Sequence, residues 1–198
     1  MFRIMFRLPT RTASRIFSAR SRLAAAAPAI AIVTVMLAVL GNIALAAQDR
    51  YTLQVPHGLA FSEFKGYETW QAVAVSHSGD VFALILANPV MIEAYKAGIP
   101  GNGKPFPDGA KMAKIHWNTK QSAEAPAPTT VPGTLHDVDF MARDSKRFAD
   151  SGNWGYAQFN YDTASGEFAP EGKGADCGFS CHTIVQAKDY VFTAYPPR

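Results

Sequence analysis

The sequence has only two cysteines among its 198 residues. This number is too small for a scaffold held by disulfide bonds and for a metal site made of cysteines alone. Acidic side chains are absent from residues 1–46, which contain six arginines, so the other residues carry 13 basic and 16 acidic side chains. The formal net charge of +3 therefore belongs to one end of the chain. Because the remainder is mildly acidic, we expect no nucleic acid among the partners.

The N-terminal segment, residues 1–46, is typical of a secretory signal peptide. Its arginines precede an apolar run over Leu23–Leu40, and small residues then lead to a cleavage position at Ala46. An uncleaved membrane anchor is the alternative, because the run approaches the ~20 residues that a spanning helix needs. Pro28 and Asn42 favour cleavage. We therefore expect a periplasmic protein that leaves the membrane once the signal peptide is removed, with cysteines available for oxidation or covalent attachment.

The other residues, 47–198, are predicted to form one strand-rich domain of mixed character, since about 150 residues is a typical domain size. Two apolar runs separated by Ser78–Asp80 indicate strands joined by a tight turn. Asn88 followed by Pro89 indicates the start of a helix. The expected elements are helices over Ala60–Trp70 and Val90–Ala97, strands over Gln71–Ser76, Val81–Leu86, Lys111–Trp117 and Trp154–Tyr161, loops over Ile99–Gly109 and Gln121–Gly133, and a segment Val185–Tyr195 that docks on the core.

Both cysteines fall in one short segment, Cys177–His182, which reads CGFSCH. Two thiols followed directly by a histidine are typical of haem c attachment, in which the thiols join the haem and the histidine binds the iron. The usual motif has two residues between the cysteines, whereas this one has three, and Gly178 is expected to absorb the longer loop. A Cys177–Cys181 disulfide and a zinc site are the alternatives. The disulfide is geometrically awkward, and the zinc site lacks a ligand.

Three segments carry a resemblance to a known family: Cys177–Tyr195 (CGFSCHTIVQAKDYVFTAY), Pro107–Lys114 (PDGAKMAK) and Asp144–Tyr156 (DSKRFADSGNWGY). Together they resemble the cytochrome P460 family of periplasmic haem c proteins. The first is similar to the family's C-terminal signature, the second to the stretch with a lysine covalently joined to the haem, and the third to the central block. The resemblance implies an α+β fold with a curved, mainly antiparallel β-sheet and a few flanking helices. It also implies one covalently attached haem c, held by a C-terminal Cys-x-x-x-Cys-His loop, and a homodimer.

The resemblance assigns roles to the residues of the motif and to one lysine. Cys177 and Cys181 would be the thioether anchors, and His182 would be the axial ligand of the haem iron. Lys114 would be the lysine cross-linked to the haem, with Lys111 as a rival. Alternation along the predicted strand places these two lysines on opposite faces.

A distal acid that accepts protons from bound substrate would fall at Asp139, with Asp137 as a substitute one strand period away. The apolar segment Val81–Leu86 is expected on the distal side, with Phe82 as a wall of the pocket.

Other side chains have two interpretations, a functional one and a simpler structural one. They are His57, His77, His116, His136, Met91, Met112 and Met141 as further iron ligands, and Arg143, Lys146 and Arg147 as contacts to haem propionates.

These residues support three hypotheses about function. The first is an enzyme that oxidises hydroxylamine at an open distal haem position, uses Lys114 and Asp139, and passes electrons to a periplasmic acceptor. The second is a protein that binds nitric oxide or another gas, like the beta-type cytochromes c-prime of the same superfamily, which suits the apolar Val81–Leu86. The third is an electron-transfer cytochrome c, but no methionine or histidine follows the motif to fill a second axial position. We favour the enzyme.

Overall fold

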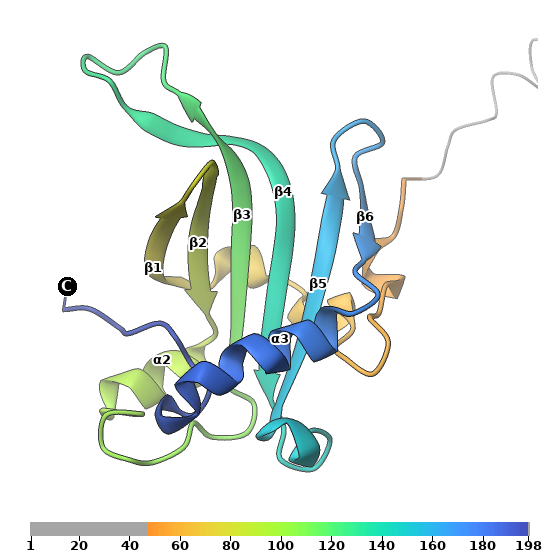
Figure 1. The fold of residues 1–198 in the computed structure, drawn as a ribbon, viewed down its shortest axis with the longest axis vertical. Helices are drawn as coiled ribbons and strands as arrows, with labels where there is room; N and C mark the ends of the chain where they lie inside the picture. The colour runs from red at the N-terminus through yellow and green to blue at the C-terminus, as the bar shows by residue number, and fades with distance from the viewer. Residues whose placement is uncertain (1–46, 198) are drawn as a thin grey trace, which may run out of the picture. The chain divides into compact units, whose positions relative to one another are not determined.

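A six-stranded antiparallel sheet organises residues 47–197, which are the residues that the computed structural model describes. Each strand pairs with the next one along the chain, so the order across the sheet is β1-β2-β3-β4-β5-β6 (Figure 1). The expected α+β fold with a mainly antiparallel sheet and few helices is confirmed. The strands are β1 (Gln71–Ser78), β2 (Val81–Ala87), β3 (Lys111–Gln121), β4 (Thr130–Arg143), β5 (Trp154–Asp162) and β6 (Glu167–Pro170).

The helices are short. Helix α3 crosses the lower part of the sheet in Figure 1 and packs on β5. Within residues 47–197, no helix is long and apolar enough to cross a membrane. The α-helices are α2 (Pro89–Lys96) and α3 (Gly174–His182), and the 3-10 helices are η2 (Arg50–Thr52), η3 (Phe61–Phe64), η4 (Tyr67–Thr69), η5 (Ala149–Ser151) and η6 (Thr183–Lys188).

Local sequence signals located the first hairpin and α2 correctly. The turn between β1 and β2 contains Gly79 with a φ of 55°, as a tight turn requires. The side chain of Asn88 caps α2 by accepting a hydrogen bond from the Met91 N–H at 3.0 Å. The single helix predicted over Ala60–Trp70 is wrong, because Gly66 adopts a φ of 82° and separates η3 from η4.

The β3–β4 hairpin is longer than the sequence predicted. Strand β3 continues past Trp117 to Gln121, where it pairs with Thr130, so the loop predicted over 121–133 is too long. Pro132 and Gly133 suggested a break at the level of local sequence. Pairing between two distant segments overrides that local signal, with irregular register around Trp117.

Two clusters of buried apolar side chains pack against the sheet. The first centres on Phe61, whose ring centroid lies 4.9–5.1 Å from those of Phe140, Phe159 and Phe168. The second contains Trp154 and the fully buried Val191, so the C-terminal segment docks on the core as expected.

Candidate functional site

A cavity of about 660 Å³ is lined by the sheet, α3 and the C-terminal segment. Its volume falls within the ~300–1,000 Å³ typical of small-molecule and cofactor sites. The residues that line it include Ile85, Met112, Lys114, Asp139, Met141, Tyr156, Cys177, Gly178, Cys181, His182, Val191 and Phe192. The two thioether anchors, the axial histidine, the cross-linking lysine and the distal acid that the resemblance implies therefore border one space, although they come from β3, β4 and α3.

The Cys-x-x-x-Cys-His motif lies on helix α3 and not in a loop, so the loop prediction is wrong. Cys177 and Cys181 are four positions apart, which is one helical turn, and both line the cavity. Both thiols are free and exposed. Helical Cβ atoms at this spacing are ~5–6 Å apart, more than the ~4.5 Å that a disulfide spans, which excludes the disulfide while the helix is intact. The three-residue spacing is therefore explained by the helix.

Gly178 permits a close approach of α3 to β5. A Cβ atom at this position would lie 2.6 Å from the Cβ of Tyr156, so any side chain would force the two elements apart. Gly174, one turn earlier, is similarly confined, since its Cβ would lie 2.9 Å from the backbone nitrogen of Gln158. The expected role of Gly178 in a longer loop is wrong, because the residue is helical. Its small size allows α3 to pack closely on β5 beside the cavity.

His182 ends α3 with one ring nitrogen already paired. Its Nδ1 lies 2.6 Å from the backbone oxygen of Tyr190, to which it donates a hydrogen bond as the neutral tautomer. The ring is held between Tyr156 and Phe192, at centroid distances of 5.0 and 4.9 Å. Burial lowers the pKa of His182, the Tyr190 hydrogen bond opposes that shift, and the charge of Lys114 adds to it. The arrangement favours a neutral imidazole with Nε2 free to bind a metal.

The two candidate lysines of β3 point to different environments. Lys111 donates from Nζ to the backbone oxygen of Glu63 at 2.7 Å and lies 5.3 Å from the centroid of the Phe64 ring. Lys114 lines the cavity. The predicted alternation along this strand therefore holds, and Lys114 is the lysine that faces the space beside the motif.

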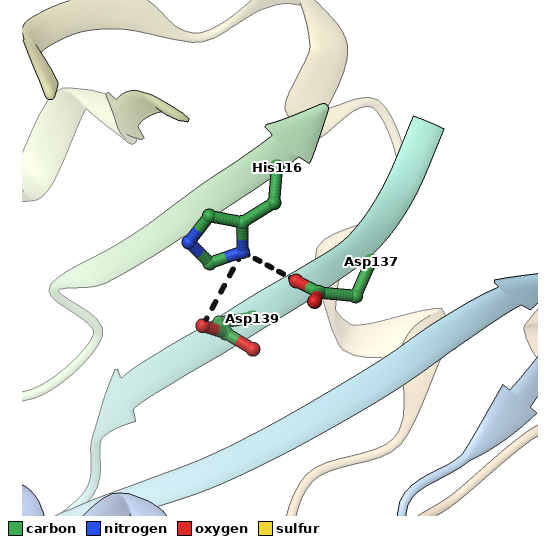
Figure 2. A group of neighbouring side chains, drawn as sticks. All are labelled: His116, Asp137 and Asp139. Atoms are coloured by element: carbon green, nitrogen blue, oxygen red, sulfur yellow. Dashed lines mark hydrogen bonds and ion pairs between the residues drawn. The ribbon is translucent and has the colours of Figure 1, made fainter. Parts of the chain in front are cut away.

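Asp139 lies directly opposite Lys114 in the register of β3 and β4. Figure 2 shows its carboxylate beside His116, whose Nδ1 is 3.7 Å from Oδ2 of Asp139. Partial burial, and then the negative charge of Asp137, raises the pKa of Asp139 to about 6, while His116 and Lys114 act in the opposite direction. A carboxyl group with this pKa can both accept and release a proton near neutral pH.

Asp137 lies on the same strand, but it is not among the residues that line the cavity. It is bonded to His116 and to His136, and the first of these bonds is drawn in Figure 2. Burial acts to raise the pKa of Asp137, but the two histidine hydrogen bonds outweigh it and hold the pKa below its usual range. His116, Asp137 and Asp139 bring potential metal ligands within 4.8 Å of one another. The hydrogen bond between His116 and Asp137 already pairs two of these three residues.

Several sequence-based expectations about the cavity need correction. Strand β2 contributes Ile85, not Phe82, to the lining. Arg143 is buried and pairs with Asp189 at 3.1 Å, so it lies among protein groups and not in the expected basic run that meets propionates. Among the lining residues that the structure describes, Met112 and Met141 are present, whereas the four other histidines are not: His57, His77, His116 and His136.

Nothing in the sequence indicated Tyr190 as a partner of His182. The contact uses a backbone carbonyl, a group that every residue carries, so the side chain at position 190 could not reveal it. The sequence also did not indicate Tyr156, which packs against Gly178 of α3 and against the ring of His182. Only the distance between β5 and α3 in the folded chain shows this role.

The fold and the cavity define an α+β protein whose thiol and imidazole groups surround a cofactor-sized space. Comparison with protein families matches residues 64–193, well over half of the chain, to the family described as Cytochrome P460. The chain belongs to this family, which confirms the resemblance seen in the sequence. Among curated proteins, no match was found. Membership makes this a haem c protein of the cytochrome P460 type and implies a periplasmic location, whereas the signal peptide stays a prediction because residues 1–46 lie outside the described residues.

The residues around the cavity fit a haem c group. Two exposed thiols lie one helical turn apart on the cavity side of α3, as two thioether bonds to one ligand require. The next residue is His182, with Nδ1 occupied and Nε2 free. The donor set is thus the one used for covalent haem with a single axial histidine.

Proposed function

We propose that this haem c protein oxidises hydroxylamine in the cavity. One observation carries the proposal: Lys114 and Asp139, opposite partners on adjacent strands, line the same cavity as Cys177, Cys181 and His182. The family resemblance assigns Lys114 as the cross-linking lysine and Asp139 as the proton acceptor, and these two roles support such an oxidation. Apolar side chains of the wall, such as Ile85 and Val191, give the cavity its shape.

Each group has a distinct task in this proposal. Cys177 and Cys181 would hold one haem, each thiol adding across a vinyl group of the haem to give a thioether, and His182 would bind its iron through Nε2. When bound, the haem supplies the redox centre that takes electrons from the substrate. Lys114 is placed where it could be the lysine joined to the edge of the haem, a bond that would alter the electronic properties of the group. A periplasmic electron acceptor would be the partner of such a protein.

Asp139 is the proton acceptor in this proposal. Removing electrons from hydroxylamine makes its N–H and O–H protons acidic, so a nearby base lowers the barrier. A carboxyl group with a pKa of about 6 is mostly ionised at neutral pH and can take such a proton. The charge of Lys114 favours the ionised form, but a lysine bonded to the haem would lose most of that influence.

Binding of nitric oxide or a similar gas is the alternative, supported by the apolar part of the wall. Ile85, Met112 and Val191 border the cavity and offer no proton donor. A gas ligand needs an open iron position and a dry pocket, but no acid. The two functions therefore differ in whether Asp139 matters.

The first experiment measures the intact mass, the absorption spectrum and hydroxylamine turnover of the purified holoprotein. We expect a mass increase of one haem and a ferrous band that is shifted to the red by the cross-link. Lys114→Ala should remove the red shift. Lys111→Ala is the matched control, since it removes a lysine from the same strand but from the opposite face. A mass without haem would refute the haem assignment, and a spectrum unchanged in Lys114→Ala would refute the cross-link.

The second experiment separates the enzyme from the gas carrier. Asp139→Asn should lower hydroxylamine turnover by roughly 10²-fold or more, the contribution usual for a general base, while haem content stays constant. Haem-loaded protein with no turnover, but with tight nitric oxide binding in both the parent and Asp139→Asn, would support the gas carrier. Light scattering of the same samples tests the homodimer that the resemblance implies.

A further inference from the structure

The turn after the motif contains two consecutive residues in an unusual conformation. Asp189 and Tyr190 have φ values of 50° and 64°, in the left-handed region that non-glycine residues rarely occupy. Such residues are strained and persist only where their surroundings enforce them. Such strain is concentrated at functional sites, so the contacts that hold these two residues are informative.

The carboxylate of Asp189 is held from two directions. Arg143, at the end of β4, lies 3.1 Å away through Nη1, and the backbone N–H of Phe106 donates to the other oxygen at 2.7 Å. Arg143 is 8% exposed, and its guanidinium lies 5.8 Å from the centroid of the Trp154 ring. An ion pair buried in this way has given up much hydration, so its geometry is tightly defined.

Tyr190 is confined just as closely. Its backbone N–H donates to the oxygen of Val185 at 3.2 Å. Its ring lies against Gly152, where a Cβ atom would come within 2.3 Å of the ring carbons. Because Asp189 and the ring of Tyr190 are both held in place, the peptide carbonyl of Tyr190 has a fixed orientation. In this orientation the carbonyl oxygen accepts the 2.6 Å hydrogen bond from Nδ1 of His182.

We propose that Arg143 and Asp189 are positioning residues for the axial ligand of the haem: they hold the strained turn so that the Tyr190 carbonyl binds Nδ1–H of His182. This proposal rests on His182 as the iron ligand. A strong acceptor at Nδ1 raises the basicity of Nε2 and fixes the ring, and a more basic ligand stabilises the oxidised iron. Arg143 and Asp189 thus act on the potential of the haem although neither lines the cavity.

The test variant is Asp189→Asn, which keeps an oxygen for the Phe106 N–H but removes the charge that binds Arg143. With this turn loosened, we expect the iron–histidine stretching band of the ferrous protein to move to lower frequency and the midpoint potential to rise. The control is Glu63→Gln, which weakens the Arg147–Glu63 ion pair, at 2.7 Å, far from the motif in sequence. The control should lower thermal stability and leave both haem readouts unchanged.

A second measurement uses the parent protein alone and so remains informative if Asp189→Asn does not fold. In the ferrous carbon monoxide complex, which is diamagnetic, the Nδ1 proton of His182 should give an NMR signal that exchanges slowly with water, because the Tyr190 carbonyl holds it. Fast exchange of that proton, or haem readouts in Asp189→Asn that match those of Glu63→Gln, would overturn the proposal. Unaltered axial coordination in His182→Ala would instead refute the assignment of His182 under the proposed function.

Discussion

Replacing Gly178 by alanine tests whether close contact between α3 and β5 builds the site. The new Cβ would lie 2.6 Å from Cβ and 2.7 Å from Cγ of Tyr156, whereas carbon atoms pack at ~3.5–4.0 Å. The helix or Tyr156 must therefore move by about 1 Å, and overpacking of this kind costs about 1–3 kcal/mol. Alanine recovers about 1 kcal/mol of helix propensity, so we expect the free energy of unfolding to fall by up to about 2 kcal/mol.

The same shift should disturb the haem site, because Cys177, Cys181 and His182 move with the helix. We expect Gly178→Ala to incorporate less haem, measured as the ratio of Soret to protein absorbance and by intact mass. Gly172→Ala is the matched control, since it lies just before α3 and a Cβ there meets no atom within 4 Å. If Gly178→Ala equals that control in stability and haem content, close approach of the helix is not what builds the site.

Three further predictions concern stability. Phe61→Ala should lower the free energy of unfolding in urea by about 3–5 kcal/mol, because the side chain is fully buried at the centre of the aromatic cluster. Asn88→Ala should cost about 1 kcal/mol in the same assay, since it removes the cap of α2. The raised pKa of Asp139 means that the folded state holds its proton more tightly, so its contribution to stability is complete below about pH 4 and is lost as the pH rises through 6. With a side chain that is 39% exposed, screening limits this loss to about 1 kcal/mol, and the decline should be missing from Asp139→Asn.

Local chemistry was enough to predict much of the fold. The turn at Gly79 and the cap at Asn88 are decided within a few residues, so the first hairpin and α2 were predicted correctly. The alternation along β3 is also local, and it is sufficient to assign Lys114 and Lys111 to opposite faces of the strand. Family resemblance then named the other residues that meet at the cavity.

Non-local pairing explains what the sequence could not reveal. Strand β4 contains Pro132 and Gly133, and only its register with β3 makes this segment extended. Helix α3 has no side-chain cap and contains Gly174 and Gly178, so its propensity is poor. Packing against β5 stabilises it, and that contact cannot be read from the nine residues of the helix.

The site depends on register more than on any single contact. Lys114 and Asp139 meet because β3 and β4 pair them directly, although they are far apart in the sequence. A slip of one residue would turn Lys114 to the face that Lys111 occupies, since side chains alternate along a strand. The buried cluster around Phe61 resists that slip, because Ala113 and Ile115 pack within it. After a slip these two side chains would have to exchange faces with Met112 and Lys114. The core around Phe61 therefore decides which lysine can reach a haem held by α3, although Phe61 itself does not line the cavity.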